Sequence, residues 1–167
     1  MALFALDHNY PAPIIEQAKP YLSGVELVFI GDIDARLPEF EDWELLLALH
    51  HHASEWDGII SNDTNMLDQE RELAVLGYTH LTLVAPVAAG HDPIRSTGLV
   101  LAHIEDIASR TTPRRPQVWR LAGRTGGGSH PDQFIEKLAK KAALDPIDLR
   151  KAATPSSAVL QRNPLAA

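Results

Sequence analysis

Three aspartates stand where a sheet could bring them together for chemistry. Asp7 directly follows the apolar run 3–6, Asp63 lies just beyond the apolar run 59–61, and Asp42 begins an apolar helical stretch. In an open parallel sheet, ligands gather outside the carboxyl ends of the strands. Carboxylates that converge there repel one another unless a hard cation neutralises them, and oxygen ligands select Mg²⁺ or Mn²⁺. Such an ion activates water and stabilises charge on a phosphate.

The same aspartates also suit ordinary structural tasks. Asp7 can end a strand, Asp42 can cap a helix and Asp63 can make a turn. Residue type and spacing alone leave both interpretations open.

Strands and helices must position these aspartates. In the first 121 residues, short apolar runs typical of strands alternate with patterns typical of helices. We expect strands at 3–6, 25–30, 59–61, 81–84 and 117–121, and helices at about 11–19, 42–54, 67–76 and 96–110. Strands separated by helices are typical of βαβ units. The sequence therefore predicts an α/β fold with an open, mainly parallel sheet and helices on both faces.

A Gly-rich stretch, 123–129, divides the chain. We interpret it as a flexible linker between an α/β domain, residues 1–122, and a basic helical extension and tail, residues 130–167. No Lys stands in the place before Ser129 that a phosphate-binding loop requires, so we expect no nucleotide site there.

Charge is divided unevenly along the chain. Residues 1–109 hold 4 Lys and Arg against 18 Asp and Glu, whereas residues 110–167 hold 11 against 4. Five arginines occur within 15 residues with no acid among them: Arg110, Arg114, Arg115, Arg120 and Arg124. Such a segment can bind a nucleic-acid backbone without sequence preference. Its alternative role is internal, to neutralise the acidic body.

Composition excludes several classes of protein. The chain has no cysteine, which rules out disulfide scaffolds, thiolate metal sites and thiol catalysis. No apolar run reaches the roughly 20 residues of a membrane helix. The first residues carry no basic region of a signal peptide, so we expect a cytoplasmic protein without membrane partners.

A run of three histidines, His50, His51 and His52, has the composition of a metal site. Consecutive helical residues point about 100° apart and cannot share one ion. We therefore expect this run to be an exposed or partly buried helix end.

Three segments resemble one family. The stretch 4–11, FALDHNYP, looks like the opening strand of PIN-like nucleases, 41–46, EDWELL, resembles their acidic helix start, and 59–65, IISNDTN, resembles their late strand. Order and separations agree over roughly residues 2–121. The resemblance implies that Asp7, Asp42 and Asp63 bind Mg²⁺ or Mn²⁺ and carry catalysis, with Asn9 and Ser61 organising them through hydrogen bonds.

The chain departs from that pattern at one position. Many PIN-like nucleases carry a second acid two residues after the late Asp, where this chain has Asn65. Asn offers a carbonyl oxygen but loses a charge. Asp68, one helical turn further on, or Glu44 could supply the missing carboxylate.

Two functions follow from the resemblance. The first is a metal-dependent endoribonuclease, a hydrolase related to the toxins of toxin–antitoxin pairs, with RNA as substrate, an antitoxin protein as partner and a homodimeric state. The alternative is a scaffold with little or no turnover that binds RNA or a protein partner through the basic segment. A phosphoacceptor role for Asp7 is disfavoured because the paired acids and late strand-end Lys of such domains are missing.

Overall fold

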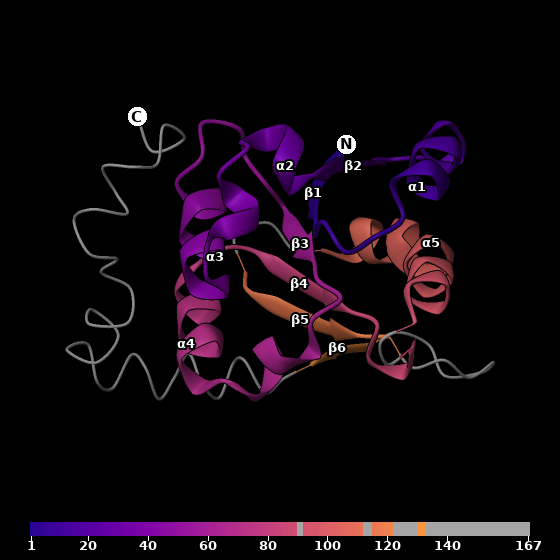
Figure 1. Cartoon of the computed structure of the whole chain (residues 1–167). Coiled ribbons are helices and arrows are strands. Elements are labelled where there is room, and N and C mark those ends of the chain that lie inside the picture. Colours follow the sequence, from indigo (N-terminus) through magenta and orange to yellow (C-terminus); the bar gives the residue numbers. More distant parts are fainter. Residues whose placement is uncertain (90–91, 112–114, 122–129, 133–167) are drawn as a thin grey trace.

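The computed structural model describes residues 1–89, 92–111, 115–121 and 130–132 (Figure 1). The strands are β1 (Ala2–Leu6), β2 (Val25–Phe29), β3 (Gly58–Ile60), β4 (Thr82–Ala85), β5 (Gln117–Arg120) and β6 (His130–Asp132). The helices are α1 (Ala12–Ala18), α2 (Ile30–Ile33), α3 (Asp42–His50), α4 (Glu70–Tyr78) and α5 (Pro93–Arg110). Four short 3₁₀-helices lie between them, at η1 (Lys19–Tyr21), η2 (Leu37–Glu39), η3 (Thr64–Asp68) and η4 (Val87–Ala89).

The described strands form one sheet in the order β2-β1-β3-β4-β5-β6. The first five strands are parallel, and β6 alone is antiparallel to its neighbour. The prediction of an α/β fold with an open, mainly parallel sheet is therefore confirmed.

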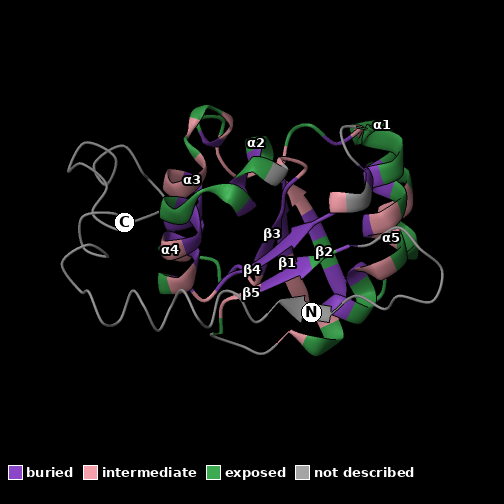
Figure 2. Ribbon diagram, turned by 90° about the horizontal axis from the view of Figure 1, so that it is seen from below, coloured by how far each residue is buried: buried purple, intermediate pink, exposed green. Residues whose placement is uncertain are grey.

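Helices cover both faces of this sheet, and each strand divides its side chains between them. Ala5, Ile59 and Leu83 pack on the side of α3 and α4, whereas their neighbours Phe4 and Ile60 pack on the side of α1 and α5. Figure 2 shows the central strands buried and the outer helical surfaces exposed. Strands that are buried on both faces are continuous apolar runs in the sequence. For this reason the apolar runs predicted β1, β3 and β4.

The connection from β4 to β5, which contains helix α5, has an unusual handedness. The connections β3-α4-β4 and β4-α5-β5 both advance in the same direction along the sheet, but α4 packs on one face and α5 on the other. The two connections therefore have opposite hands, and parallel crossovers almost always share one hand. The apolar stripe of α5, which includes Val100, Ile104 and Ile107, covers the face that the seven-residue α1 leaves open.

Several boundaries differ from the expected ones. Ile30 begins α2 instead of ending a strand, α3 stops at His50, and α5 begins at Pro93, where Pro suits the first helical turn. Residues 130–132, expected in the helical extension, form β6 instead and pair with β5. Pro131 suits an edge strand, because its missing N–H is tolerated there. The linker 123–129 and residues 133–167 of the predicted extension lie outside the described residues.

The longest helix in the described part of the chain, α5, is amphipathic. No helix among these residues is long and apolar enough to cross a membrane.

Gly58 is required where β3 passes β1 and β4. A Cβ built there would lie 2.3 Å from the Thr82 carbonyl oxygen and 2.6 Å from Cε1 of Phe4. Neither the backbone of a neighbouring strand nor a fully buried ring can move away easily. The central strands can therefore approach this closely only because residue 58 has no side chain.

We expect Gly58→Ala to lower the free energy of unfolding by about 3 kcal/mol, because the added methyl group overpacks the core. The matched control is Gly98→Ala in α5, where a Cβ would meet nothing within 4 Å. This control should leave stability unchanged or raise it by up to about 1 kcal/mol, through helix propensity. Urea denaturation measures both, and equal midpoints for the two variants would contradict the prediction.

Candidate functional site

The carboxyl ends of β1 and β3 lie side by side at the point where the strand order reverses. From β1 the chain moves outward to β2, whereas from β3 it moves the other way to β4. In doubly wound sheets the ligand crevice lies at this switch point. The ladder continues past both strands, because Asp7 N–H donates to the Ile60 carbonyl at 3.0 Å and Ser61 N–H donates to the Val84 carbonyl at 3.0 Å. Two of the predicted segments are therefore held together by backbone hydrogen bonds.

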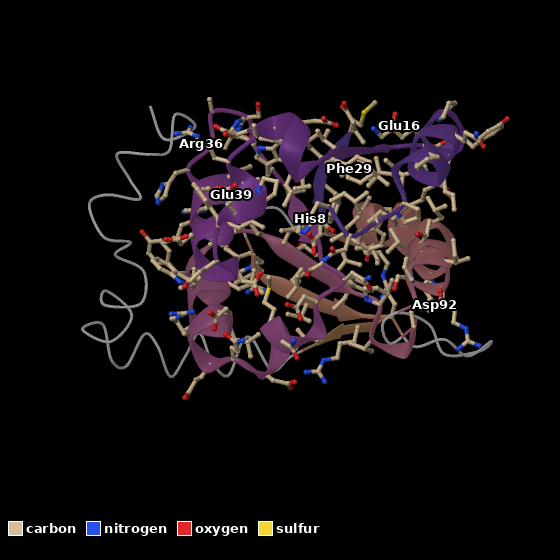
Figure 3. All side chains as sticks on the ribbon, in the orientation of Figure 1. His8, Glu16, Phe29, Arg36, Glu39 and Asp92 are labelled. Atoms are coloured by element: carbon tan, nitrogen blue, oxygen red, sulfur yellow. The ribbon has the colours of Figure 1, made fainter. Side chains whose placement is uncertain are left out.

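The Asp7 carboxylate is largely buried, with its side chain 14% exposed, and two neighbours contact it. Nδ1 of His8 lies 2.8 Å from Oδ1, and Nδ2 of Asn9 donates to Oδ2 at 3.4 Å. The hydrogen bond expected from Asn9 is thus present. In Figure 3, His8 lies between the layer of α3 and the layer of α5.

Asp63 caps the turn η3, and Ser61 supports its backbone. The Asp63 N–H donates to Oγ of the buried Ser61 at 3.1 Å, and Oδ1 of Asp63 accepts from the Asn65 N–H at 2.8 Å. Ser61 therefore organises Asp63 through the main chain, and the backbone of Asn65 already engages one carboxylate oxygen. The side chains of Asn65 and Asp68 lie exposed along η3.

Asp42 enters the site at the first turn of α3. A capping box closes this end of the helix, in which the Glu41 side chain accepts from the Glu44 N–H and Oε2 of Glu44 accepts from the Glu41 N–H at 3.1 Å. Glu44 thus contributes to the cap, while Asp42 is half-buried beside the sheet edge. A helix N-terminus favours a nearby negative charge, which offsets part of the cost of burying Asp42.

The pKa of Asp42 shows that the predicted aspartates share one region. Burial and the neighbouring charges together raise this pKa from 3.8 to about 6; burial is the largest cause, followed by the charges of Asp63, Asp7, Glu72 and Glu41 in that order. Like charges that face each other across partly buried space disfavour ionisation. The structure brings Asp7, Asp42 and Asp63 within electrostatic reach, but in the described residues no three acidic or histidine side chains converge closely enough to hold a metal ion.

Glu72 is a buried carboxylate that the sequence prediction missed. Its side chain is 3% exposed and receives hydrogen bonds from Nε and Nη2 of Arg71 at 2.9 and 2.6 Å. The sequence held one signal for it, because Glu72 shares a helical face with the buried Val75 and Leu76. A glutamate on an apolar face needs a partner, and Arg71 supplies one.

Arg71 also ties α4 to the start of α3. Its Nη2 lies 3.3 Å from Oε2 of Glu41, the same oxygen that accepts from Nε1 of Trp43 at 2.6 Å. The Arg71 guanidinium lies 5.5 Å from the Trp43 ring centroid. One cation thus links the helix that carries Asp42 to the helix that carries Glu72.

The predicted arginines do not gather at one place. Arg120 ends β5 and lies at the carboxyl edge of the sheet, with the aspartates. Arg110, whose guanidinium lies 4.9 Å from the Trp119 ring, ends α5, and Arg115 precedes β5, so both lie at the amino edge. Arg114 and Arg124 lie outside the described residues.

No protein-family model, curated protein or solved structure matches this chain. Membership of the PIN-like family therefore stays a prediction that depends on the three motifs.

The raised pKa of Asp42 predicts how stability responds to its removal. Between pH 3.8 and about 6 the folded chain binds more protons than the unfolded chain, so the charge of Asp42 lowers stability as pH rises through this window. After allowance for solvent screening, Asp42→Asn should raise the free energy of unfolding at pH 8 by on the order of 1 kcal/mol. Near pH 4 the gain should vanish.

Urea denaturation of chelator-treated protein at both pH values measures this difference. The control is Glu55→Gln, an exposed acid before β3 at the opposite edge of the sheet, which should change little at either pH. A variant Asp42→Asn that is no more stable than wild type at pH 8 would contradict the electrostatic account.

Proposed function

We propose that this chain is a metal-dependent endoribonuclease of the PIN-like type. The observation that carries the proposal is the half-buried Asp42, whose ionisation is opposed by Asp7 and Asp63 across the switch point of the sheet. These carboxylates repel one another at the carboxyl edge of the sheet. A cation that binds there would remove the repulsion and so stabilise the fold. The motifs at 4–11, 41–46 and 59–65 specify which cation chemistry to test.

The chemical type of the donors suits a hard divalent cation, and binding would require the three carboxylates to move closer together than they lie in the described structure. All three side chains offer carboxylate oxygens, which select Mg²⁺ or Mn²⁺, and Mg²⁺ needs only one or two carboxylates because it keeps several waters. When bound, such an ion supplies an activated water and charge stabilisation for phosphodiester hydrolysis. In this proposal Asp7 and Asp63 hold the ion, and Asp42, fully ionised once the positive charge is present, completes the set or orients the attacking water.

The chain's own residues have further parts in this proposal. His8 and Asn9 fix the Asp7 carboxylate, and Ser61 fixes the Asp63 backbone. Arg120, at the same edge of the sheet, offers a positive charge for the RNA backbone. A toxin role with an antitoxin partner, a homodimeric state and a cytoplasmic location are parts of the proposal that depend on the resemblance alone.

A second candidate is a scaffold that binds RNA or a protein partner without turnover. Asn65 favours it, since this residue replaces the family's additional acid and its backbone N–H engages Oδ1 of Asp63. Asn65→Asp separates the candidates if the wild-type chain is inactive. Cleavage gained in this variant would identify the missing charge as the cause.

Cleavage of a structured RNA by purified protein tests the nuclease proposal. We expect activity with Mn²⁺, none with EDTA, and a loss of roughly 100-fold or more in Asp7→Asn and in Asp63→Asn, because each variant removes a charged ligand. Glu55→Gln is the control and should retain full activity. Metal-dependent cleavage that persists in both aspartate variants would point to a contaminating nuclease and reject the assignment.

RNA binding should distinguish the two edges of the sheet. We expect Arg120→Gln to weaken binding of single-stranded RNA and to reduce the slope of log K against log salt by about 1, because one phosphate contact is lost. Arg115→Gln, the matched change at the amino edge, should leave both quantities nearly unchanged. Titrations by fluorescence anisotropy at several salt concentrations measure the affinity and its salt dependence. Equal effects of the two variants would contradict RNA binding at the carboxyl edge.

A further inference from the structure

A pair of histidines lies at the amino edge of the sheet, at the opposite end of α3 from Asp42. His50 is the last residue of α3, and His80 lies between α4 and β4. Their Nδ1 atoms are 2.8 Å apart, and Nε2 of His80 lies 3.1 Å from the carbonyl oxygen of Trp56. Both side chains are half-buried. The run of three histidines in the sequence thus gains a partner from 30 residues further along the chain.

The hydrogen-bond partners determine where the protons lie. A carbonyl oxygen only accepts, so Nε2 of His80 carries the proton and, in the neutral ring, its Nδ1 has a free lone pair. That lone pair faces Nδ1 of His50. In the metal-free chain Nδ1 of His50 therefore donates to Nδ1 of His80, and a single proton stands between the two rings.

We propose that these two Nδ1 atoms bind a borderline divalent transition-metal ion, with Zn²⁺, Ni²⁺ and Cu²⁺ as the class, in place of the shared proton. Imidazole nitrogen suits these ions. The Nε2–H of His80 on a backbone carbonyl is the arrangement that orients metal-binding histidines in proteins. This inference stands on the histidine pair alone and does not depend on the proposed nuclease function.

Binding needs a small rearrangement and no net loss of protons. The His50 proton moves from Nδ1 to Nε2, which leaves the ring neutral and frees the second lone pair. The imidazole of His51, whose ring centroid lies 4.8 Å from that of His50, stands beside the pair. No set of three such ligands converges within the described residues, so we assign the other coordination positions to water.

The surroundings of His50 favour the neutral ring that a metal requires. The rings that contact His50 are those of His51 on its own helix end, Tyr78 on α4 and His80 before β4. Burial, with smaller contributions from the neighbouring His80 and His51, lowers the pKa of His50 to about 4. The ring is therefore neutral at neutral pH and offers one lone pair, which is on Nδ1 once the proton has moved to Nε2; protons compete with the metal as the pH falls.

Calorimetric titration of tag-free, chelator-washed protein with Zn²⁺ at pH 7.5 tests this site. We expect one ion per chain at the pair and a loss of affinity of at least about tenfold in His50→Gln and in His80→Gln. Gln at position 80 keeps an N–H for the Trp56 carbonyl, so this variant should stay folded, which circular dichroism checks. The matched control is His52→Gln, because Nδ1 of His52 already accepts from the Ser54 N–H at 2.9 Å.

The acidic edge is excluded by a second control, Asp7→Asn, which should bind Zn²⁺ at the histidine pair as tightly as wild type does. Zn²⁺ should also shift the imidazole ¹⁵N resonances of His50 and His80, with the largest change at Nδ1. Unchanged affinity in both His50→Gln and His80→Gln, or no binding by the wild-type chain, would overturn the proposal and leave the pair as a structural hydrogen bond.

Discussion

The backbone hydrogen bond from Asp7 to the Ile60 carbonyl is the constraint on which the candidate site depends. It extends the β1–β3 ladder one residue beyond the strands, so the chain cannot separate Asp7 from the 61–63 turn without breaking the centre of the sheet. Both strands are buried on their two faces, and Gly58 lets them lie close to their neighbours. The central strands, the most stable part of the molecule, therefore hold the mutually repelling carboxylates in place. The exposed loops contribute little to holding them.

The third aspartate is held by different means. Asp42 belongs to α3, whose buried Leu46 and Leu49 share one apolar cluster with residues of the sheet, and whose start is linked to α4 by the Arg71 network. Arg71 places positive charge between Glu72 and Glu41, two of the carboxylates that raise the pKa of Asp42. Half of its side chain is exposed, so the individual ion pairs stabilise the fold only modestly. Their greater effect is on position, because they fix how the start of α3 faces the sheet.

Sequence patterns predicted the features that depend on local or continuous signals. The strands at 3–6, 59–61 and 81–84 were located because burial on both faces leaves an unbroken apolar run, and Asp7 and Asp63 were located with them. Glu72 was missed although its direct partner Arg71 is its neighbour in sequence, because the link from Arg71 to the start of α3 is made by Glu41, thirty residues away. Local patterns also could not predict that α5 packs on the same face of the sheet as α1. That packing depends on how much of the face the short helix α1 leaves uncovered.

The predicted arginine segment shows the same limit. Arg110, Arg115 and Arg120 are near one another in sequence, but strand β5 begins just after Arg115 and ends at Arg120, so these two residues lie at opposite edges of the sheet. Residues close in sequence are close in space only if the element between them allows it. A strand places the residues at its two ends at opposite edges of the sheet.

Helices α3 and α4 connect the two edges of the sheet at which the proposed sites lie. Both helices begin at the acidic edge, with Asp42 and Glu72, and both end near the histidine pair. The helix dipole favours negative charge at the first end and positive charge at the second. At the acidic end burial and mutual repulsion oppose ionisation of Asp42, and at the other end burial opposes protonation of His50. Desolvation therefore outweighs the dipole at both ends. In both proposals a bound cation would relieve this strain on ionisation or protonation: carboxylate oxygens suit a hard ion at the acidic edge, and imidazole nitrogens suit a softer ion at the histidine pair.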